Sequence, residues 1–181
     1  VDVVLADERW VNETDKASNT RLVKEHLLRN NAAAATYFSL KQKGDSPGEG
    51  LDAVKTELES LARPLDVLIL GMGNDGHTAS LFPDAPEIVH AMDAENRAAV
   101  ASMSPPSQEQ QRIKLTYALM CEARFTALHL RGGDKLDTLR LALGQRSFTR
   151  RLGRRWHGDQ PCPISSGRSF RGAVHCYPRR Y

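Results

Sequence analysis

Apolar runs alternate along the chain with segments in which apolar residues recur at helical spacing. Residues 1–6 are predicted to form a buried strand, and residues 66–70, the strongest strand pattern, a second one. Residues 18–28 begin with a Ser-Asn pair that suits a helix N-terminus, and one face of this helix should carry Leu22, Val23, His26, Leu27 and Leu28. Residues 51–61 show a second helical pattern after a loop at 44–50. Further elements are expected near residues 98–101, 112–115, 117–122, 124–130 and 134–143.

This order of elements is typical of an α/β protein with a Rossmann-like, largely parallel sheet flanked by helices. The chain has 181 residues, 40% of them hydrophobic, which is enough for one domain with a core and leaves little room for two. No internal repeat is visible. We therefore expect one α/β domain over residues 1–143 and a segment of a different kind at 144–181.

The strand predicted at 66–70 runs directly into Gly-Met-Gly-Asn-Asp-Gly-His at residues 71–77. The glycines match the G-x-G-x-x-G spacing of dinucleotide-binding sites. Such a site needs a long helix after the third glycine, whereas Pro83 ends any helix here after about two turns. No acidic residue clearly ends a second strand about 20 residues further on. The segment is therefore not expected to bind a dinucleotide.

The same segment places an imidazole beside a carboxylate, because Asp75 and His77 flank Gly76. In open α/β sheets, ligands bind beyond the carboxyl ends of the strands, where loops can approach them. Near neutral pH, imidazole is the side chain best suited to take a proton from water and return it to a leaving oxygen. The pair predicts hydrolase chemistry. The alternative is that His77 only begins a helix while Asp75 binds backbone amides.

Composition limits the other classes of protein. Cys121, Cys162 and Cys176 lack C-x-x-C spacing, so neither a disulfide framework nor a zinc site is expected, and a reducing cytoplasm fits best. No stretch approaches the roughly 18 to 20 apolar residues of a membrane span, and the first residues do not resemble a signal peptide. We expect no metal, no other cofactor and no membrane partner.

Charge is distributed unevenly along the chain. Nine arginines and a single acidic residue, Asp159, give residues 144–181 a net charge of +8, whereas the other 143 residues carry 16 basic and 21 acidic residues. A basic arm that contacts nucleic-acid phosphates is one interpretation. Such an arm usually contains lysines as well, and this segment has none, so no specific nucleic-acid partner is expected. The arginine-rich, aperiodic sequence instead suggests translation in a wrong reading frame.

Four motifs, in matching order, resemble landmarks of the glucosamine-6-phosphate isomerase/6-phosphogluconolactonase family. The longest is Gly-Met-Gly-Asn-Asp-Gly-His-Thr-Ala-Ser-Leu-Phe-Pro at residues 71–83, which is similar to the lactonase signature. The others are Asp-Glu-Arg-Trp-Val at 7–11 with Ser-Asn at 18–19, Ser-Pro-Pro at 104–106 with Arg-Ile-Lys-Leu-Thr at 112–116, and Gly-Gly-Asp-Lys at 132–135. The resemblance implies the fold shared by glucosamine-6-phosphate deaminases and ribose-5-phosphate isomerases.

The resemblance also implies an activity, the metal-independent hydrolysis of 6-phospho-D-glucono-1,5-lactone to 6-phosphogluconate in the pentose phosphate pathway. His77 would be the general base that activates water for attack on the lactone carbonyl. Asp75 would orient His77 or the sugar hydroxyls. Arg9 would bind the substrate or stabilise the developing oxyanion together with amides of the glycine-rich segment.

Substrate-binding residues are assigned through the same resemblance. The phosphate of the sugar lactone would be bound by Arg112 and by Lys135, which lies in a glycine-rich turn at a helix start. Asp7 would help to hold Arg9. Further substrate contacts are assigned to Asn19, Gly71, Gly73, Asn74 and Thr78.

Departures from the family pattern leave other functions open. Family members begin with a further helix, strand and phosphate-binding loop, so this chain is expected to lack the N-terminal part of the fold. They close with an apolar strand, and residues 144–181 are expected to contain none. A glucosamine-6-phosphate deaminase-like enzyme is one alternative, although residues 78–83 lack the acid of the F-N-E-P segment typical of such enzymes. An inactive, truncated product whose basic tail binds polyanions is another.

Overall fold

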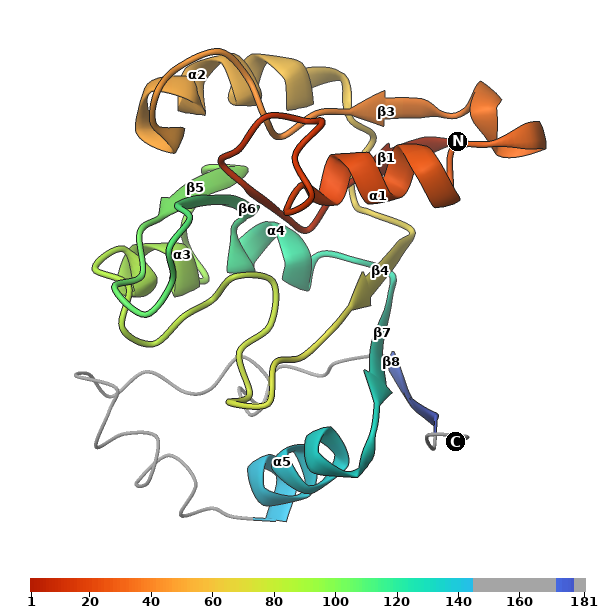
Figure 1. Cartoon of the computed structure of the whole chain (residues 1–181), viewed down its shortest axis with the longest axis vertical. Helices are drawn as coiled ribbons and strands as arrows, with labels where there is room; N and C mark the ends of the chain where they lie inside the picture. The colour runs from red at the N-terminus through yellow and green to blue at the C-terminus, as the bar shows by residue number, and fades with distance from the viewer. Residues whose placement is uncertain (145–171, 178–181) are drawn as a thin grey trace.

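A computed structural model describes residues 1–144 and the backbone of residues 172–177 (Figure 1). The strands in these residues are β1 (Asp2–Val4), β2 (Asp7–Arg9), β3 (Thr36–Phe38), β4 (Val67–Leu70), β5 (Val100–Met103), β6 (Arg112–Leu115), β7 (Phe125–Arg131) and β8 (Gly172–Tyr177). The α-helices are α1 (Asn19–His26), α2 (Pro47–Glu57), α3 (Ile88–Met92), α4 (Tyr117–Cys121) and α5 (Gly133–Gly144), and 3₁₀ turns cover Asn30–Ala34 and Leu58–Ser60. The elements form the α/β fold that the sequence predicts.

The strands of the described residues form three small sheets, and two of these sheets have the predicted parallel pairing. β1 pairs with β3, and β7 pairs with β4 on one edge and with β8 on the other. The third sheet has the order β2-β6-β5 and is antiparallel, which the sequence pattern did not indicate. In Figure 1, β5 lies between α2 and α3, and β7 leads down to α5.

Polar caps determine where two helices begin. Ser18 Oγ accepts a hydrogen bond from the Arg21 N–H at 3.1 Å, which starts α1. Thr116 Oγ1 accepts from the Leu119 N–H at 3.4 Å, so α4 begins directly after β6. Both caps stand next to strands of the antiparallel sheet, and they fix the direction in which the chain leaves it.

A hydrophobic core joins α2, α3 and α4 to the sheets. Burial of each large apolar side chain stabilises the fold by roughly 1.5–3 kcal/mol. The members of this core that are 0% exposed are Leu40, Val54, Ala91, Met103, Ile113 and Leu115. A smaller cluster of Met72, Leu130 and Leu139 packs the glycine-rich segment against β7 and α5.

Two predictions for the N-terminal region are wrong in detail. Residues 1–6 do not form one buried strand, because β1 ends at Val4 and Val1 is 98% exposed. The helix predicted at 18–28 ends at His26, and two residues of its apolar face, Leu22 and Leu27, are 42% and 52% exposed. α1 is instead attached by its N-terminus, since Thr20 is its only buried residue.

The expectation that residues 144–181 contain no strand is also wrong. β8 lies parallel to β7, in a register that runs from Thr126 opposite Gly172 to Arg131 opposite Tyr177. The sequence Gly-Ala-Val-His-Cys-Tyr contains neither proline nor arginine, so it can extend along the edge that β7 offers. Apart from β8, the segment assigned to a shifted reading frame or a basic arm, 145–171 and 178–181, lies outside the described residues, and both interpretations stay predictions.

Candidate active site

The glycine-rich segment after β4 forms a tight loop closed by its own backbone. The Gly73 N–H donates to the His77 carbonyl at 2.8 Å, and the Gly76 N–H donates to the Gly73 carbonyl at 3.1 Å. Gly76 has a φ of 90°, a conformation that side chains rarely allow. Thr78 Oγ1 donates to the Gly71 carbonyl at 2.7 Å and closes the base of the loop. Of the predicted substrate contacts, Gly71, Gly73 and Thr78 thus have structural roles in the loop itself.

His77 and Asp75 form the pair that their spacing predicts. His77 Nδ1 lies 2.7 Å from Asp75 Oδ1, and the two side chains are 28% and 59% exposed. A carboxylate facing Nδ1 favours the tautomer with its proton there, which leaves the Nε2 lone pair as a base. In the alternative interpretation, the helix start at His77 is wrong, since the next helix of the chain, α3, begins only at Ile88. The other part is confirmed, because Asp75 Oδ1 also accepts the His77 backbone N–H at 3.3 Å.

Gly73 makes room for this pair. A Cβ atom at position 73 would lie 2.4 Å from Asp75 Oδ1 and 2.5 Å from His77 Nδ1. Real Cβ contacts are essentially never shorter than 3.0 Å. Any side chain at this position would therefore push the carboxylate and the imidazole out of place.

The turn after His77 connects the loop to the antiparallel sheet. The Phe82 ring packs on the His77 imidazole, with ring centroids 4.1 Å apart. The guanidinium carbon of Arg112 lies 5.2 Å from the centroid of the same ring. Ser80 Oγ donates to Asp7 Oδ2 at 2.5 Å. The last of these contacts joins residues that are 73 positions apart in the chain, so the loop and the antiparallel sheet contribute to one site.

Arg9 is held by a clamp that differs from the predicted one. Its Nη1 donates to Asn19 Oδ1 at 2.6 Å and to the Ala17 carbonyl at 2.9 Å. Asn19 Nδ2 donates to the Asp7 backbone carbonyl at 2.9 Å. The partner of the Asp7 carboxylate is the hydroxyl of Ser80, and among the described residues no hydrogen bond or ion pair joins this carboxylate to Arg9. Asn19 is thus a positioning residue for Arg9.

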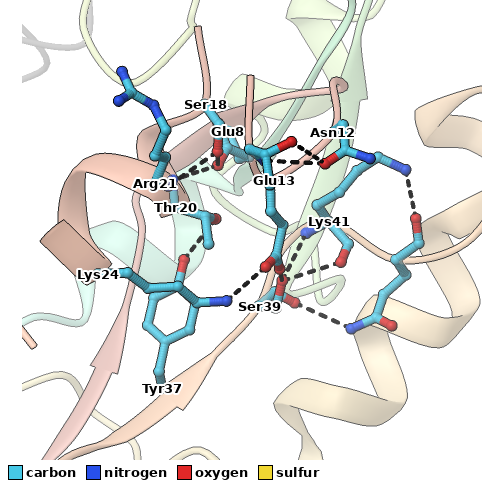
Figure 2. Close-up of polar contacts among 12 residues, drawn as sticks. Glu8, Asn12, Glu13, Ser18, Thr20, Arg21, Lys24, Tyr37, Ser39 and Lys41 are labelled. Atoms are coloured by element: carbon cyan, nitrogen blue, oxygen red, sulfur yellow. Dashed lines mark hydrogen bonds and ion pairs between the residues drawn. The ribbon is translucent and has the colours of Figure 1, made fainter. Parts of the chain in front are cut away.

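Glu8 is a residue of this site that the sequence analysis missed. It is 1% exposed, and Figure 2 shows it between Ser18 and Thr20 at the start of α1. Its carboxylate accepts hydrogen bonds from the Ser18 hydroxyl and from three N–H groups, those of Arg9, Asn19 and Thr20, at 2.6–3.1 Å. A carboxylate at a helix N-terminus is favourable, and this one joins β2 to α1. The alternation of Asp7, Glu8 and Arg9 in a strand, which turns only Glu8 inward, was the available signal.

Two buried cations lie on β6. Arg112 is 5% exposed, and its Nη2 donates to Gln108 Oε1 at 2.9 Å. Burial and the neighbouring Arg9 lower the pKa of Arg112, whereas Asp7 and Glu8 oppose this shift. Arg112 Nε and Lys114 Nζ are buried and have no hydrogen-bond partner among the described residues.

Helix α5 carries Lys135 and contacts the glycine-rich loop at Asn74. Thr138 Oγ1 donates to the Asn74 carbonyl at 2.9 Å, so α5 docks on the glycine-rich loop, as Figure 1 shows for the segment that descends from β4. Lys135 stands in the first turn of α5 and is half-buried. It forms no ion pair within the described part of the chain. Its place in the first turn of α5, the helix that docks on Asn74, is what relates Lys135 to the loop.

No group of three or more His, Cys, Asp or Glu side chains able to hold a metal ion lies within residues 1–144 and 172–177. Nor does any helix in that part of the chain reach the length and apolar character needed to cross a bilayer.

Fold and site place the chain in the class of α/β proteins whose chemistry lies on loops at the carboxyl ends of parallel strands. Residues 1–157 match the family described as glucosamine-6-phosphate isomerases/6-phosphogluconolactonase. The chain is 44% identical over 143 residues to 6-phosphogluconolactonase from Pseudomonas aeruginosa, and the matched region covers 79% of this chain and 60% of that protein. It is 39% identical over 135 residues to 6-phosphogluconolactonase from Mesorhizobium japonicum, covering 75% and 57%. The chain therefore belongs to the glucosamine-6-phosphate isomerase/6-phosphogluconolactonase family.

Solved structures agree with this assignment. A 6-phosphogluconolactonase from Shewanella baltica superposes with a TM-score of 0.85 at 34% identity, over 98% of this chain and 72% of that one. A monomeric glucosamine-6-phosphate deaminase superposes with a TM-score of 0.66 at 15% identity, over 97% of this chain and 71% of that one, which shows the shared fold alone. The chain spans about three fifths of the length of the curated relatives that it matches.

Proposed function

We propose that the protein hydrolyses 6-phospho-D-glucono-1,5-lactone to 6-phosphogluconate, a step of the pentose phosphate pathway, in the cytoplasm. The observation that carries the proposal is the His77–Asp75 pair, joined through Phe82 to the guanidinium group of Arg112. A base next to a buried cation suits a substrate that is both an ester and an anion. Family membership supports the same reaction.

The reaction begins with removal of a proton from water. Nε2 of His77 accepts this proton as the water oxygen adds to the lactone carbonyl carbon. The tetrahedral intermediate then collapses, and the bond between that carbon and the ring oxygen breaks. Protonated His77 returns the proton to the ring oxygen, which leaves as the hydroxyl of the open-chain acid. Asp75 keeps the imidazole in the required tautomer at 2.7 Å.

Cationic residues of the antiparallel sheet and of α5 bind the substrate and stabilise the charge that develops on it. Arg9, clamped by Asn19, stabilises the oxyanion that develops on the carbonyl oxygen. Arg112 binds the substrate phosphate, a role supported by its charge and by an Nε that has no hydrogen-bond partner among the described residues. Lys135 approaches the same phosphate from the first turn of α5. No metal or cofactor takes part in these steps.

The direct experiment is an assay of the purified full chain with freshly prepared 6-phosphogluconolactone, in which formation of 6-phosphogluconate is measured against spontaneous hydrolysis. We expect enzymatic acceleration that persists in a chelator. Glucosamine 6-phosphate is assayed in parallel for release of ammonia, and we expect none, because residues 78–83 contain no acid. Absence of lactone hydrolysis, or ammonia release instead, would show that the proposal is wrong.

A further inference from the structure

Strand β6 carries a lysine in a place that suits an apolar residue. Ile113 and Leu115 belong to the hydrophobic core and are 0% exposed, so the alternating residues Arg112 and Lys114 share the other face of the strand. Lys114 is 0% exposed as well, and its Nζ has no hydrogen-bond partner among the described residues. No role for this lysine follows from the sequence pattern alone.

The register of the sheet places one acid beside this lysine. Lys114 lies opposite Asp7 of β2 and opposite Ala101 of β5. Residues directly opposite each other on neighbouring strands share one face, with Cβ atoms about 4.5–5.5 Å apart. Arg9 lies opposite Arg112 in the same way. Asp7 therefore shares one face of the sheet with three cationic residues, Arg9, Arg112 and Lys114.

A buried ammonium without a hydrogen-bond partner destabilises the fold. Desolvation lowers the pKa of Lys114 from 10.5 to about 7, and the charge of Asp7 opposes this shift. A methionine would fill similar space without the free energy of desolvating a charge. A residue that lowers stability at a well-packed position points to a role in function.

Asp7 connects Lys114 to the turn that follows the base. Its Oδ2 accepts the hydroxyl of Ser80 at 2.5 Å. Ala79 and Ser80 both have left-handed backbones, with φ of 47° and 54°, a conformation that is unfavourable for residues other than glycine. Such a turn persists only where surrounding contacts hold it, and the Ser80–Asp7 hydrogen bond is one of them. Two residues further on, Phe82 packs on the imidazole of His77.

We infer that Lys114 is a positioning residue of the active site: it orients the Asp7 carboxylate, and through Asp7 it holds the Ser80 turn that sets Phe82 against His77. When it is protonated, the buried ammonium of Lys114 attracts the Asp7 carboxylate across the strand pair, because burial of the lysine limits screening by water. The carboxylate then accepts the Ser80 hydroxyl in a charge-assisted hydrogen bond. The kinetic part of this inference rests on the proposed lactonase function.

The kinetic test uses the full chain with Lys114→Met, which removes the charge and keeps a long side chain. We expect a higher thermal midpoint, because a desolvated charge is removed. We expect kcat to fall by about ten- to a hundredfold with little change in KM, because a displaced base loses its orientation. Lys55→Met is the matched control, since Lys55 is 47% exposed and pairs with Asp52, and it should leave kcat unchanged. Wild-type kcat in Lys114→Met overturns the inference.

Coupling to Ser80 separates a positioning role from a general effect on packing. Ser80→Ala removes the hydroxyl that donates to Asp7 and leaves Lys114 in place. If both residues act in one series of contacts, the double variant should lose no more kcat than the more impaired single variant. Losses that multiply in the double variant contradict the inference.

A readout without turnover distinguishes this inference from the lactonase proposal. The ring centroids of Phe82 and His77 lie 4.1 Å apart, so the ring current of Phe82 shifts the NMR signals of the His77 imidazole protons. These signals should move in Lys114→Met and in Ser80→Ala, whereas those of His26, on α1, should not. If the wild type lacks lactonase activity and the His77 signals still move, the proposed function fails and the inference stands. Unmoved His77 signals overturn it whatever the activity.

Discussion

The antiparallel and parallel sheets differ in how completely they are buried. All four residues of β6 are buried, including Arg112 and Lys114. β4 alternates instead, with Val67 and Ile69 59% and 67% exposed on one face. The antiparallel sheet is a packed platform whose charged side chains have little freedom, whereas the parallel sheet places its chemistry on a loop beyond β4. The candidate site thus has a rigid side that supplies cations and a loop side that supplies the base.

The largest effect should come from the loop side, with His77→Ala. A general base contributes about 10²–10⁴-fold to the rate, so kcat for the lactone should fall by that factor while the fold stays intact. His26→Ala is the control, because this exposed histidine lies on α1 away from the loop. Steady-state kinetics and circular dichroism of both variants give the comparison. A His77→Ala variant with more than about a third of wild-type activity would exclude His77 as the base.

Gly73→Ala should disturb the same pair without removing either partner. The new Cβ would lie 2.4 Å from Asp75 Oδ1, and since side chains rather than backbone obstruct it, the pair should separate while stability changes little. We expect kcat to fall by about ten- to a hundredfold. Gly48→Ala in α2 is the control, because its Cβ would meet only Ser46 Oγ at 3.8 Å. Equal kinetics in the two variants would mean that the pair tolerates displacement.

Variants of the cations should change binding rather than the chemical step. Arg112→Ala and Lys135→Ala should each raise KM for the phosphorylated lactone by about tenfold or more, because each loses a charge-assisted hydrogen bond to phosphate. Hydrolysis of unphosphorylated gluconolactone should change much less. Arg140→Ala, at an exposed position of α5, controls for the loss of one positive charge. Equal losses on both substrates would assign the two cations a structural role instead.

The smallest effect concerns stability and pH on the rigid side. The pKa of Lys114 is lowered to about 7 in the folded protein, against 10.5 ordinarily, so between these values the unfolded chain binds more protons. Stability from this group therefore rises with pH above about 7 and is independent of pH below that. Denaturant unfolding of wild type and Lys114→Met across this range should show the stability advantage of the variant shrinking as pH rises. A constant difference would mean that Lys114 titrates near its ordinary pKa.

Much of the loop side was predictable from the sequence, because its geometry is local. Asp75 and His77 are two residues apart, and the glycines around them allow few backbone paths. The strand before the loop was also predictable, since residues 66–70 are almost continuously apolar. Short strands were harder: β2 and β8 carry no strong local pattern and exist through pairing with β6 and β7. For α1 the pattern was clear but the predicted burial was wrong, since Leu22 and Leu27 are exposed. Periodicity indicates that a helix has an apolar face, but it does not show whether another element packs on that face.

Local sequence patterns were sufficient to predict the α/β class and the His77–Asp75 pair, and the family motifs propose roles for Arg9, Arg112 and Lys135. Contacts between distant segments, which no local pattern shows, place Asn19 rather than the Asp7 carboxylate against Arg9 and join β2 to α1 through Glu8. The packing of these segments also brings Ser80 to Asp7, and it buries Lys114 with no hydrogen-bond partner for its Nζ in the part of the chain that the structure describes. The physical reason is range: periodicity and turn chemistry act over a few residues, whereas partners for buried polar groups are chosen by register and packing between distant segments.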